Sequence, residues 1–139
     1  MPSMEISMPK VTDLVRARLA FDLTAVFCTT GGFEPEIFGM RFNEYGPGFA
    51  AQGGKLWDGT GHPYLHILLY TPRLKKSVKR TLIERLSAAF AAAVENPEWV
   101  PVIHLCEHPY DDIGVGGKLL SDAYEECRKR KFYYDLPED

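Results

Sequence analysis

The sequence predicts an α/β fold in which two tandem βαβ units form a four-stranded sheet with two helices on one face. The main observation is an internal repeat. Shifted by 63 residues, positions 9–58 align with 72–121 without a gap and with 11 identities in 50 pairs. Unrelated segments of this length share roughly three, so the chain is a duplicated unit. Each copy also holds an apolar strand-like run followed by an amphipathic stretch of helical length.

The length and composition fit one compact domain. The chain has 139 residues, of which 45% are hydrophobic and 25% are charged. We therefore expect a single domain over 1–139, built of repeats at about 2–61 and 62–125, with a C-terminal tail at 126–139. The aromatic residues of the tail suggest that it packs on a neighbouring subunit.

Each repeat begins with a strand. Residues 4–8 alternate between apolar and polar, which is typical of a half-buried strand. Residues 64–70 form a nearly continuous apolar run, which indicates a strand buried on both faces. A proline closes each strand, Pro9 in the first copy and Pro72 in the second.

A helix follows each strand. Apolar residues recur at spacings of three and four, which marks one buried helix face. Gly31-Gly32 ends the first helix, and Asn96-Pro97 follows the second. The two predicted stripes are Val11, Val15, Leu19, Leu23, Val26 and Phe27, and Leu74, Val78, Leu82, Leu86, Ala89, Phe90 and Ala93.

A second strand completes each unit, at 38–42 and at 100–105, and a glycine-rich return with small hairpin strands follows it. A strand–helix–strand connection places its two strands in parallel with a right-handed crossover. The chain has no further helices to cover the other face of the sheet. We therefore expect its largest exposed apolar area to contact another subunit.

Charge and cysteine content exclude several classes of partner. The net charge is −3, which argues against nucleic acid and anionic membranes, and no apolar run approaches the roughly 20 residues that span a bilayer. The N-terminus lacks the pattern of a signal peptide. Cys28, Cys106 and Cys127 have no metal-like spacing. We expect a cytoplasmic protein without metal, nucleic acid or membrane.

The return of the second copy resembles the 4-oxalocrotonate tautomerase family. Glu107 is followed by Ile-Gly-Val-Gly-Gly-Lys-Leu at 113–119, and the first copy keeps a weaker form at 44–56. The chain also begins Met1-Pro2. It is similar to a fused member of this superfamily. The resemblance implies a homotrimer of fused chains, a small carboxylic-acid substrate, an amino-terminal proline as catalyst, and no cofactor.

Removal of Met1 makes Pro2 a free secondary amine. An α-amino group titrates near pH 8, and apolar walls or nearby cations lower its pKa toward neutrality. A base poised near the working pH moves protons next to a carbonyl efficiently. We therefore expect Pro2 to act as general base and acid in a tautomerase of 2-keto or 2-hydroxy-dienoate acids.

The family also uses arginines to hold substrate carboxylates. Arg73 matches the first of these places in the second copy, and Lys10 is its counterpart in the first. Arginine suits the role because its planar fork bonds two oxygens at once. We expect Arg73 to be catalytic and Lys10 to bind substrate.

The other family positions are altered. Gly39 and Val102 hold the places of the second arginine, and the places of an aromatic gate hold Ala50 and Ile113. The next candidates for substrate binding are Arg41 and His104, two residues further along the same strand faces, together with Phe49 and Ile113.

Two alternatives remain open at this point. One is a dehalogenase, hydratase or decarboxylase of 3-carbon acids, in which His66, His104 or Glu107 activates water. The other is a trimeric binding protein without catalysis, because fold alone does not establish function. Glu44 and Glu107 recur in both copies, which indicates either a structural role or a carboxylate that tunes Pro2.

Overall fold

The computed structural model describes residues 2–123, and the tail predicted at 126–139 lies outside them. The first half contains β1 (Ser3–Pro9), α1 (Asp13–Gly31), η1 (Pro35–Ile37), β2 (Gly39–Tyr45) and a hairpin of β3 (Ala51–Gln52) and β4 (Lys55–Leu56). The second half contains β5 (His66–Thr71), α2 (Lys76–Val94), β6 (Val102–Glu107), η2 (Tyr110–Asp112), a hairpin of β7 (Gly114–Val115) and β8 (Lys118–Leu119), and α3 (Leu120–Ala123).

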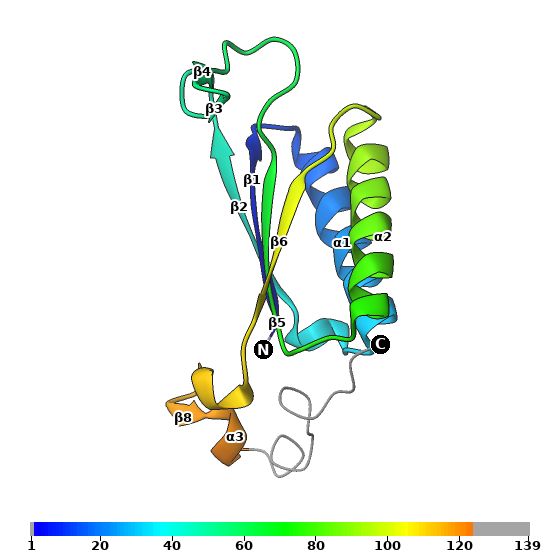
Figure 1. The fold of residues 1–139 in the computed structure, drawn as a ribbon, viewed down its shortest axis with the longest axis vertical. Coiled ribbons are helices and arrows are strands. Elements are labelled where there is room, and N and C mark those ends of the chain that lie inside the picture. Colours follow the sequence, from blue (N-terminus) through cyan, green and yellow to red (C-terminus); the bar gives the residue numbers. More distant parts are fainter. Residues whose placement is uncertain (1, 124–139) are drawn as a thin grey trace.

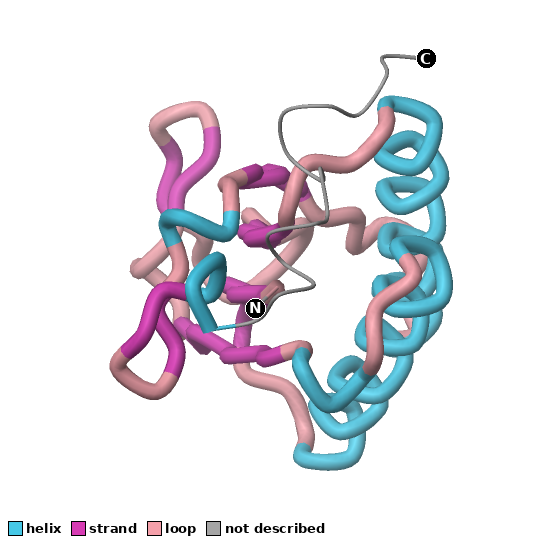
Figure 2. Tube along the Cα trace, turned by 90° about the horizontal axis from the view of Figure 1, so that it is seen from below, coloured by secondary structure: helices cyan, strands magenta, loops and turns pink. Residues whose placement is uncertain are grey.

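The four long strands form one sheet in the order β2-β1-β5-β6. The pairs β1–β2 and β5–β6 are parallel, as the βαβ pattern predicts, and β1 and β5 meet antiparallel at the centre. In this register Ser3 lies opposite both Gly39 and Tyr70. Both long helices cover one side of the sheet, and the hairpins lie on the other (Figures 1 and 2). The predicted fold class is confirmed.

The hydrophobic core lies between the sheet and the two helices. The alternating residues of β1 and β5 that face the helices are fully buried, and they pack against the predicted helix stripes. The largest fully buried side chains are Phe27, Phe90, Met4, Ile6, Met8, Leu19, Leu23, Leu65, Ile67, Leu69, Leu82 and Leu86.

The helix ends follow local sequence signals. The Thr12 side chain accepts a hydrogen bond from the Val15 N–H at 3.2 Å and so caps α1. Gly32 ends α1 in the left-handed conformation, with φ of 75°, which glycine adopts without strain. Glu95 does the same for α2 with φ of 55°, one residue before the predicted Asn96-Pro97 stop.

The open face of the sheet is not a continuous apolar surface. In β5 buried residues alternate with half-buried ones, so the strand is not buried on both faces within one chain. The open face carries polar side chains, among them Glu5, Arg41 and His104. The most exposed large apolar side chains lie elsewhere: Leu14 and Phe21 on α1, and Phe49 and Leu56 at the first hairpin. Among residues 2–123, no helix combines the length and the apolar content that crossing a membrane requires.

Candidate active site at the Pro2 end of the sheet

Pro2 lies at the start of a central strand and is buried. Its carbonyl accepts a hydrogen bond from the Gly39 N–H at 3.2 Å, which ties the beginning of β1 to the beginning of β2. Because Ser3 pairs with Tyr70 in an antiparallel register, β5 ends at the same end of the sheet at which β1 begins. Arg73 follows two residues after that strand end. The fold therefore brings Pro2 and Arg73 to one end of the sheet.

Ile113 follows β6 at this end. Since β6 runs parallel to β5, its last residue pairs with Thr71, and η2 and the second hairpin come next. The Ile113 N–H donates to the Tyr110 carbonyl at 3.4 Å, and the Ile113 carbonyl accepts from the Leu120 N–H at 2.8 Å. Figure 1 shows the N-terminus, β8 and α3 at the lower end of the sheet and the β3–β4 hairpin at the upper end.

Lys10 and Phe49 lie at the opposite end. Lys10 follows β1, a strand of seven residues, which is about 23 Å long. Phe49 lies between β2 and β3 with 83% of its surface exposed. Within one chain, neither residue can join Pro2 in a small-molecule site. Their predicted role in substrate binding therefore requires a second chain.

Arg41 and His104 lie on the open face of the sheet, and each has a partner there. Arg41 forms an ion pair with Glu5, which is opposite it in the β1–β2 register. The His104 Nδ1 lies 2.6 Å from the His66 Nε2, and the two rings meet edge to face with centroids 4.9 Å apart. These contacts hold the side chains of Arg41 and His104 on the open face of the sheet, between its two ends.

The histidine pair gives the fold a pH dependence. Burial lowers the pKa of His66, and the charge of His104 adds to this effect. Since the unfolded chain takes up the proton first, stability is fully present above about pH 6.5 and falls as the pH drops below it. We expect the free energy of unfolding in urea to decrease from pH 7.5 to pH 5.5, and the His66→Asn variant to show a smaller decrease. Equal decreases in both proteins would contradict this assignment.

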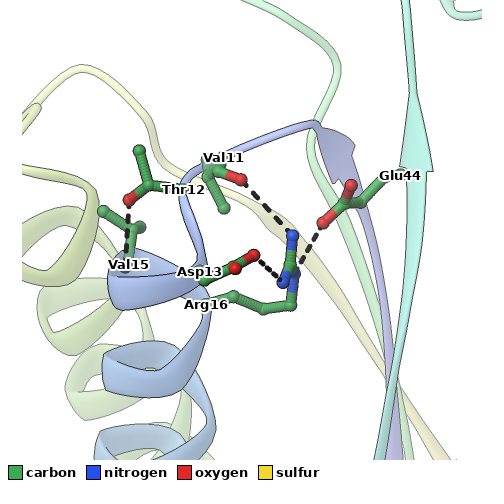
Figure 3. Close-up of polar contacts among 6 residues, drawn as sticks. All are labelled: Val11, Thr12, Asp13, Val15, Arg16 and Glu44. Carbon is green, nitrogen blue, oxygen red and sulfur yellow. Dashed lines mark hydrogen bonds and ion pairs between the residues drawn. The ribbon is translucent and has the colours of Figure 1, made fainter.

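The recurring glutamates form equivalent ion pairs in the two repeats. Figure 3 shows Arg16 of α1 between Glu44, Asp13 and the Val11 carbonyl. The Arg16 Nε lies 2.7 Å from Glu44, and this hydrogen bond is the main reason that the pKa of Arg16 is raised.

Lys79 aligns with Arg16 at the 63-residue shift and forms the equivalent ion pair. Its Nζ lies 2.5 Å from the Oε1 of Glu107. The other Glu107 oxygen accepts from the Leu74 N–H at 2.7 Å. Both glutamates thus join the end of a strand to the first turns of a helix. This geometry supports the structural interpretation of their recurrence.

Removal of the Glu107 carboxylate tests that interpretation. Glu107→Ala leaves the Leu74 N–H and the Lys79 ammonium without their acceptor, and we expect it to lower the free energy of unfolding by about 1–3 kcal/mol. Glu84→Ala, on the exposed side of α2, is the matched control and should change it by less than about 0.5 kcal/mol. A catalytic loss at unchanged stability would instead favour the water-activating role.

The sequence interpretation missed Thr71. This residue ends β5, its side chain is fully buried, and its Oγ1 has no hydrogen-bond partner among the described residues. It lies one position beyond the Ser3–Tyr70 pair, which puts it beside the start of β1. The alternation of β5 could have revealed Thr71 in the sequence, because it places this polar residue on the helix-facing side at the end of the strand.

Comparison with known proteins identifies the fold. Neither protein-family models nor curated proteins match the sequence. Among solved structures, a native fused 4-OT (4-oxalocrotonate tautomerase) has a TM-score of 0.78 at 22% identity, over 87% of this chain and 98% of that chain. A fused 4-OT asymmetric trimer has a TM-score of 0.77 at 21% identity, over 86% and 97%. Macrophage migration inhibitory factor of Toxoplasma gondii has a TM-score of 0.68 at 15% identity, over 84% and 97%. This chain therefore shares the fold of the fused 4-OT structures over most of its length.

Proposed function

We propose that the protein is a cofactor-independent tautomerase in which Pro2 carries the proton. The observation that supports this most is the position of Pro2, buried at the start of a central strand and at the same sheet end as Arg73, in a fold shared with the fused 4-OT structures. A free amine at this place needs only removal of Met1.

The proposed reaction is a proton transfer between oxygen and carbon of a small 2-hydroxy-dienoate or 2-keto acid. The Pro2 nitrogen takes the proton of the enol hydroxyl, and the electron pair of that O–H bond forms the C=O bond. The electron pair of the C=C bond then takes the proton back from Pro2 at carbon. Pro2 is buried, and burial disfavours the protonated form of a free amine, so we expect its pKa to lie below that of an ordinary α-amino group.

Arg73 holds the substrate carboxylate and stabilises the enolate oxygen as its charge develops. A guanidinium can bond two oxygens in one plane, and preorganised donors of this kind contribute most in the transition state. The hydroxyl of Thr71, buried at the same end of the sheet, is a further hydrogen-bonding group for a bound substrate.

We further propose a homotrimer, the assembly named for the fused 4-OT of similar structure. Apolar side chains stand exposed on both hairpins, with Leu56 exposed by 66% and Leu119 by 45%. Burying them against a neighbour removes apolar surface from water. In such an assembly Lys10 and Phe49 of one chain can approach Pro2 of another. Light scattering should give three times the 15.7 kDa mass of the chain. We also propose a cytoplasmic location, where a reducing environment would keep cysteine thiols free.

The activity test uses phenylenolpyruvate and 2-hydroxymuconate, whose ketonisation changes their ultraviolet absorbance. The protein without Met1 should accelerate ketonisation of at least one of them without added metal or cofactor. No acceleration by a protein with a verified free Pro2 amine would contradict the proposal.

A binding protein without catalysis is the second candidate. The ion pair of Arg41 with Glu5 favours it. This contact engages the guanidinium of Arg41, which lies two residues from the altered arginine position at Gly39 and on the same strand face. Such a protein would bind a carboxylate at the Pro2 end and leave its ketonisation rate unchanged.

A further inference from the structure

The backbone that carries Arg73 is fixed by residues at the end of β6. The Thr71 carbonyl, two residues before Arg73, accepts a hydrogen bond from the His108 N–H at 3.1 Å. The Leu74 N–H, one residue after Arg73, donates to the Glu107 Oε2 at 2.7 Å. The side chains of Thr71 and Leu74 are buried, whereas Arg73 is half-buried. The backbone is therefore held on both sides of Arg73, while its side chain keeps access to the surface.

The start of α2 depends on Glu107 for this hydrogen bond. Its N-cap residue, Lys75, makes no side-chain capping hydrogen bond, and the first turn contains no acidic residue. Glu107 is 22% exposed, and its other carboxylate oxygen lies 2.5 Å from the Lys79 Nζ. An ionised acceptor makes a stronger hydrogen bond to an N–H than a neutral one does. The carboxylate thus links the end of β6 to the residue that follows Arg73.

The first repeat provides an internal comparison. Glu44 forms the equivalent ion pair with Arg16, and Arg16 also donates to the Val11 carbonyl at 3.4 Å (Figure 3). Val11 aligns with Leu74 at the 63-residue shift. Among residues 2–123, however, no hydrogen bond joins Glu44 to the Val11 N–H. The ion pair is common to both repeats, whereas the bond to the backbone N–H occurs only in the repeat that carries Arg73.

We propose that Glu107 is a positioning residue, which orients Arg73 toward the substrate carboxylate. Glu107 does not contact the substrate. It acts through the Leu74 N–H, which fixes the backbone next to Arg73, and the ion pair with Lys79 holds the carboxylate in place. A binding group contributes fully only when its own support is fixed. The inference rests on the proposed role of Arg73 and adds the residue that holds it.

Charge alone predicts the opposite effect when Glu107 is removed. A carboxylate close to the site repels a bound carboxylate, so its removal should tighten binding if only charge matters. If Glu107 positions Arg73, its removal frees the backbone beside the guanidinium and weakens binding. The direction of the change in affinity therefore separates the two explanations.

Binding of hydrocinnamate, an aromatic monocarboxylate without a keto or enol group, tests the proposal without requiring catalysis. The Met1-free protein is titrated by nuclear magnetic resonance, which also measures weak binding. Glu107→Ala should raise the dissociation constant about tenfold or more. Lys79→Met is the matched control, because it removes the ion pair and leaves the Leu74 N–H its acceptor. It should leave the dissociation constant within about twofold.

A double-mutant cycle shows whether Glu107 acts through Arg73. Arg73→Ala alone should weaken hydrocinnamate binding at least as much as Glu107→Ala does. In the Arg73→Ala background, Glu107→Ala should change the dissociation constant by no more than about twofold, because the group that it positions is gone. A role in stability alone would instead give the same factor in both backgrounds.

A second variant keeps the acceptor and removes the charge. In the Lys79→Met background, Glu107→Gln offers an amide oxygen to the Leu74 N–H, with no ammonium beside its amide nitrogen. It should bind hydrocinnamate about as tightly as Lys79→Met alone. Binding as weak as that of Glu107→Ala would overturn the proposal.

Four further results would overturn the proposal. Glu107→Ala leaves binding unchanged or tightens it, or Lys79→Met weakens binding equally, or the Glu107 and Arg73 effects multiply, or the unaltered protein does not bind hydrocinnamate. A protein that binds hydrocinnamate, shows the expected cycle and does not ketonise its substrates supports the positioning role and contradicts the tautomerase proposal. The two failures are thereby distinguished.

Discussion

A protein that retains Met1 should lose almost all ketonisation activity. With Met1 in place the Pro2 nitrogen is part of a peptide bond, has no basic lone pair, and cannot carry a proton. General acid–base catalysis contributes roughly 10²–10⁴-fold, so we expect a rate decrease of that size. The measurement compares initial ultraviolet rates of two preparations whose N-termini are verified by intact mass spectrometry.

Two controls separate the amine from general damage. A protein extended by one residue at the C-terminus should keep full activity, because its N-terminus is unchanged. Pro2→Ala with Met1 removed keeps a primary amine and should keep partial activity. Equal rates in the Met1-free and Met1-retaining proteins would exclude Pro2 as the catalyst.

Arg73→Ala should have the second-largest effect. Loss of its guanidinium removes the carboxylate clamp and a donor to the developing enolate, and comparable donors contribute about 2–4 kcal/mol to the transition state. We therefore expect kcat/KM to fall by about 30- to 1000-fold. Arg73→Lys keeps the charge without the planar fork and should recover part of this loss.

Arg80→Ala is the matched control. Arg80 is an exposed arginine in the first turns of α2, seven residues after Arg73. It should leave kcat/KM within about twofold, since exposed surface substitutions rarely affect a distant site. Equal activities of the Arg73 and Arg80 variants, at equal stability, would show that Arg73 does not hold the substrate.

The fold was predictable because several independent signals agree. The alternation at residues 4–8 gives one buried strand face, and the helix stripes through Phe27 and Phe90 give the surfaces that cover it. The repeat then requires the second unit to fold like the first. Residues such as Gly32 mark where the helices end, and their conformations agree with that role.

The candidate site was only partly predictable, because sequence alignment does not show how the two units meet. Lys10 and Arg73 align at the 63-residue shift and look equivalent. The antiparallel pairing of β1 with β5 sends them to opposite ends of the sheet. A periodic pattern places a residue on a face, but the position along the sheet depends on the pairing of distant strands.

The open-face contacts were hidden for a related reason. The alternation of a strand places Arg41 on the same face as Gly39, and His104 on the same face as Val102. The side chains that Arg41 and His104 contact, however, come from other strands. Glu5 reaches Arg41 through the β1–β2 register, and His66 reaches His104 through the β5–β6 register. Partners separated by 36 and 38 residues leave no local signal in the sequence.

The most direct test of the proposed mechanism is the pKa of the Pro2 nitrogen. Nitrogen resonance of the Met1-free protein labelled with 15N-proline isolates it, since the other nine of the ten prolines have peptide nitrogens that do not titrate. We predict a pKa below the value near 8 of an ordinary α-amino group, and a pH profile of kcat/KM that follows the same pKa. A Pro2 pKa at or above 8, or activity that does not follow its titration, would contradict Pro2 as the general base.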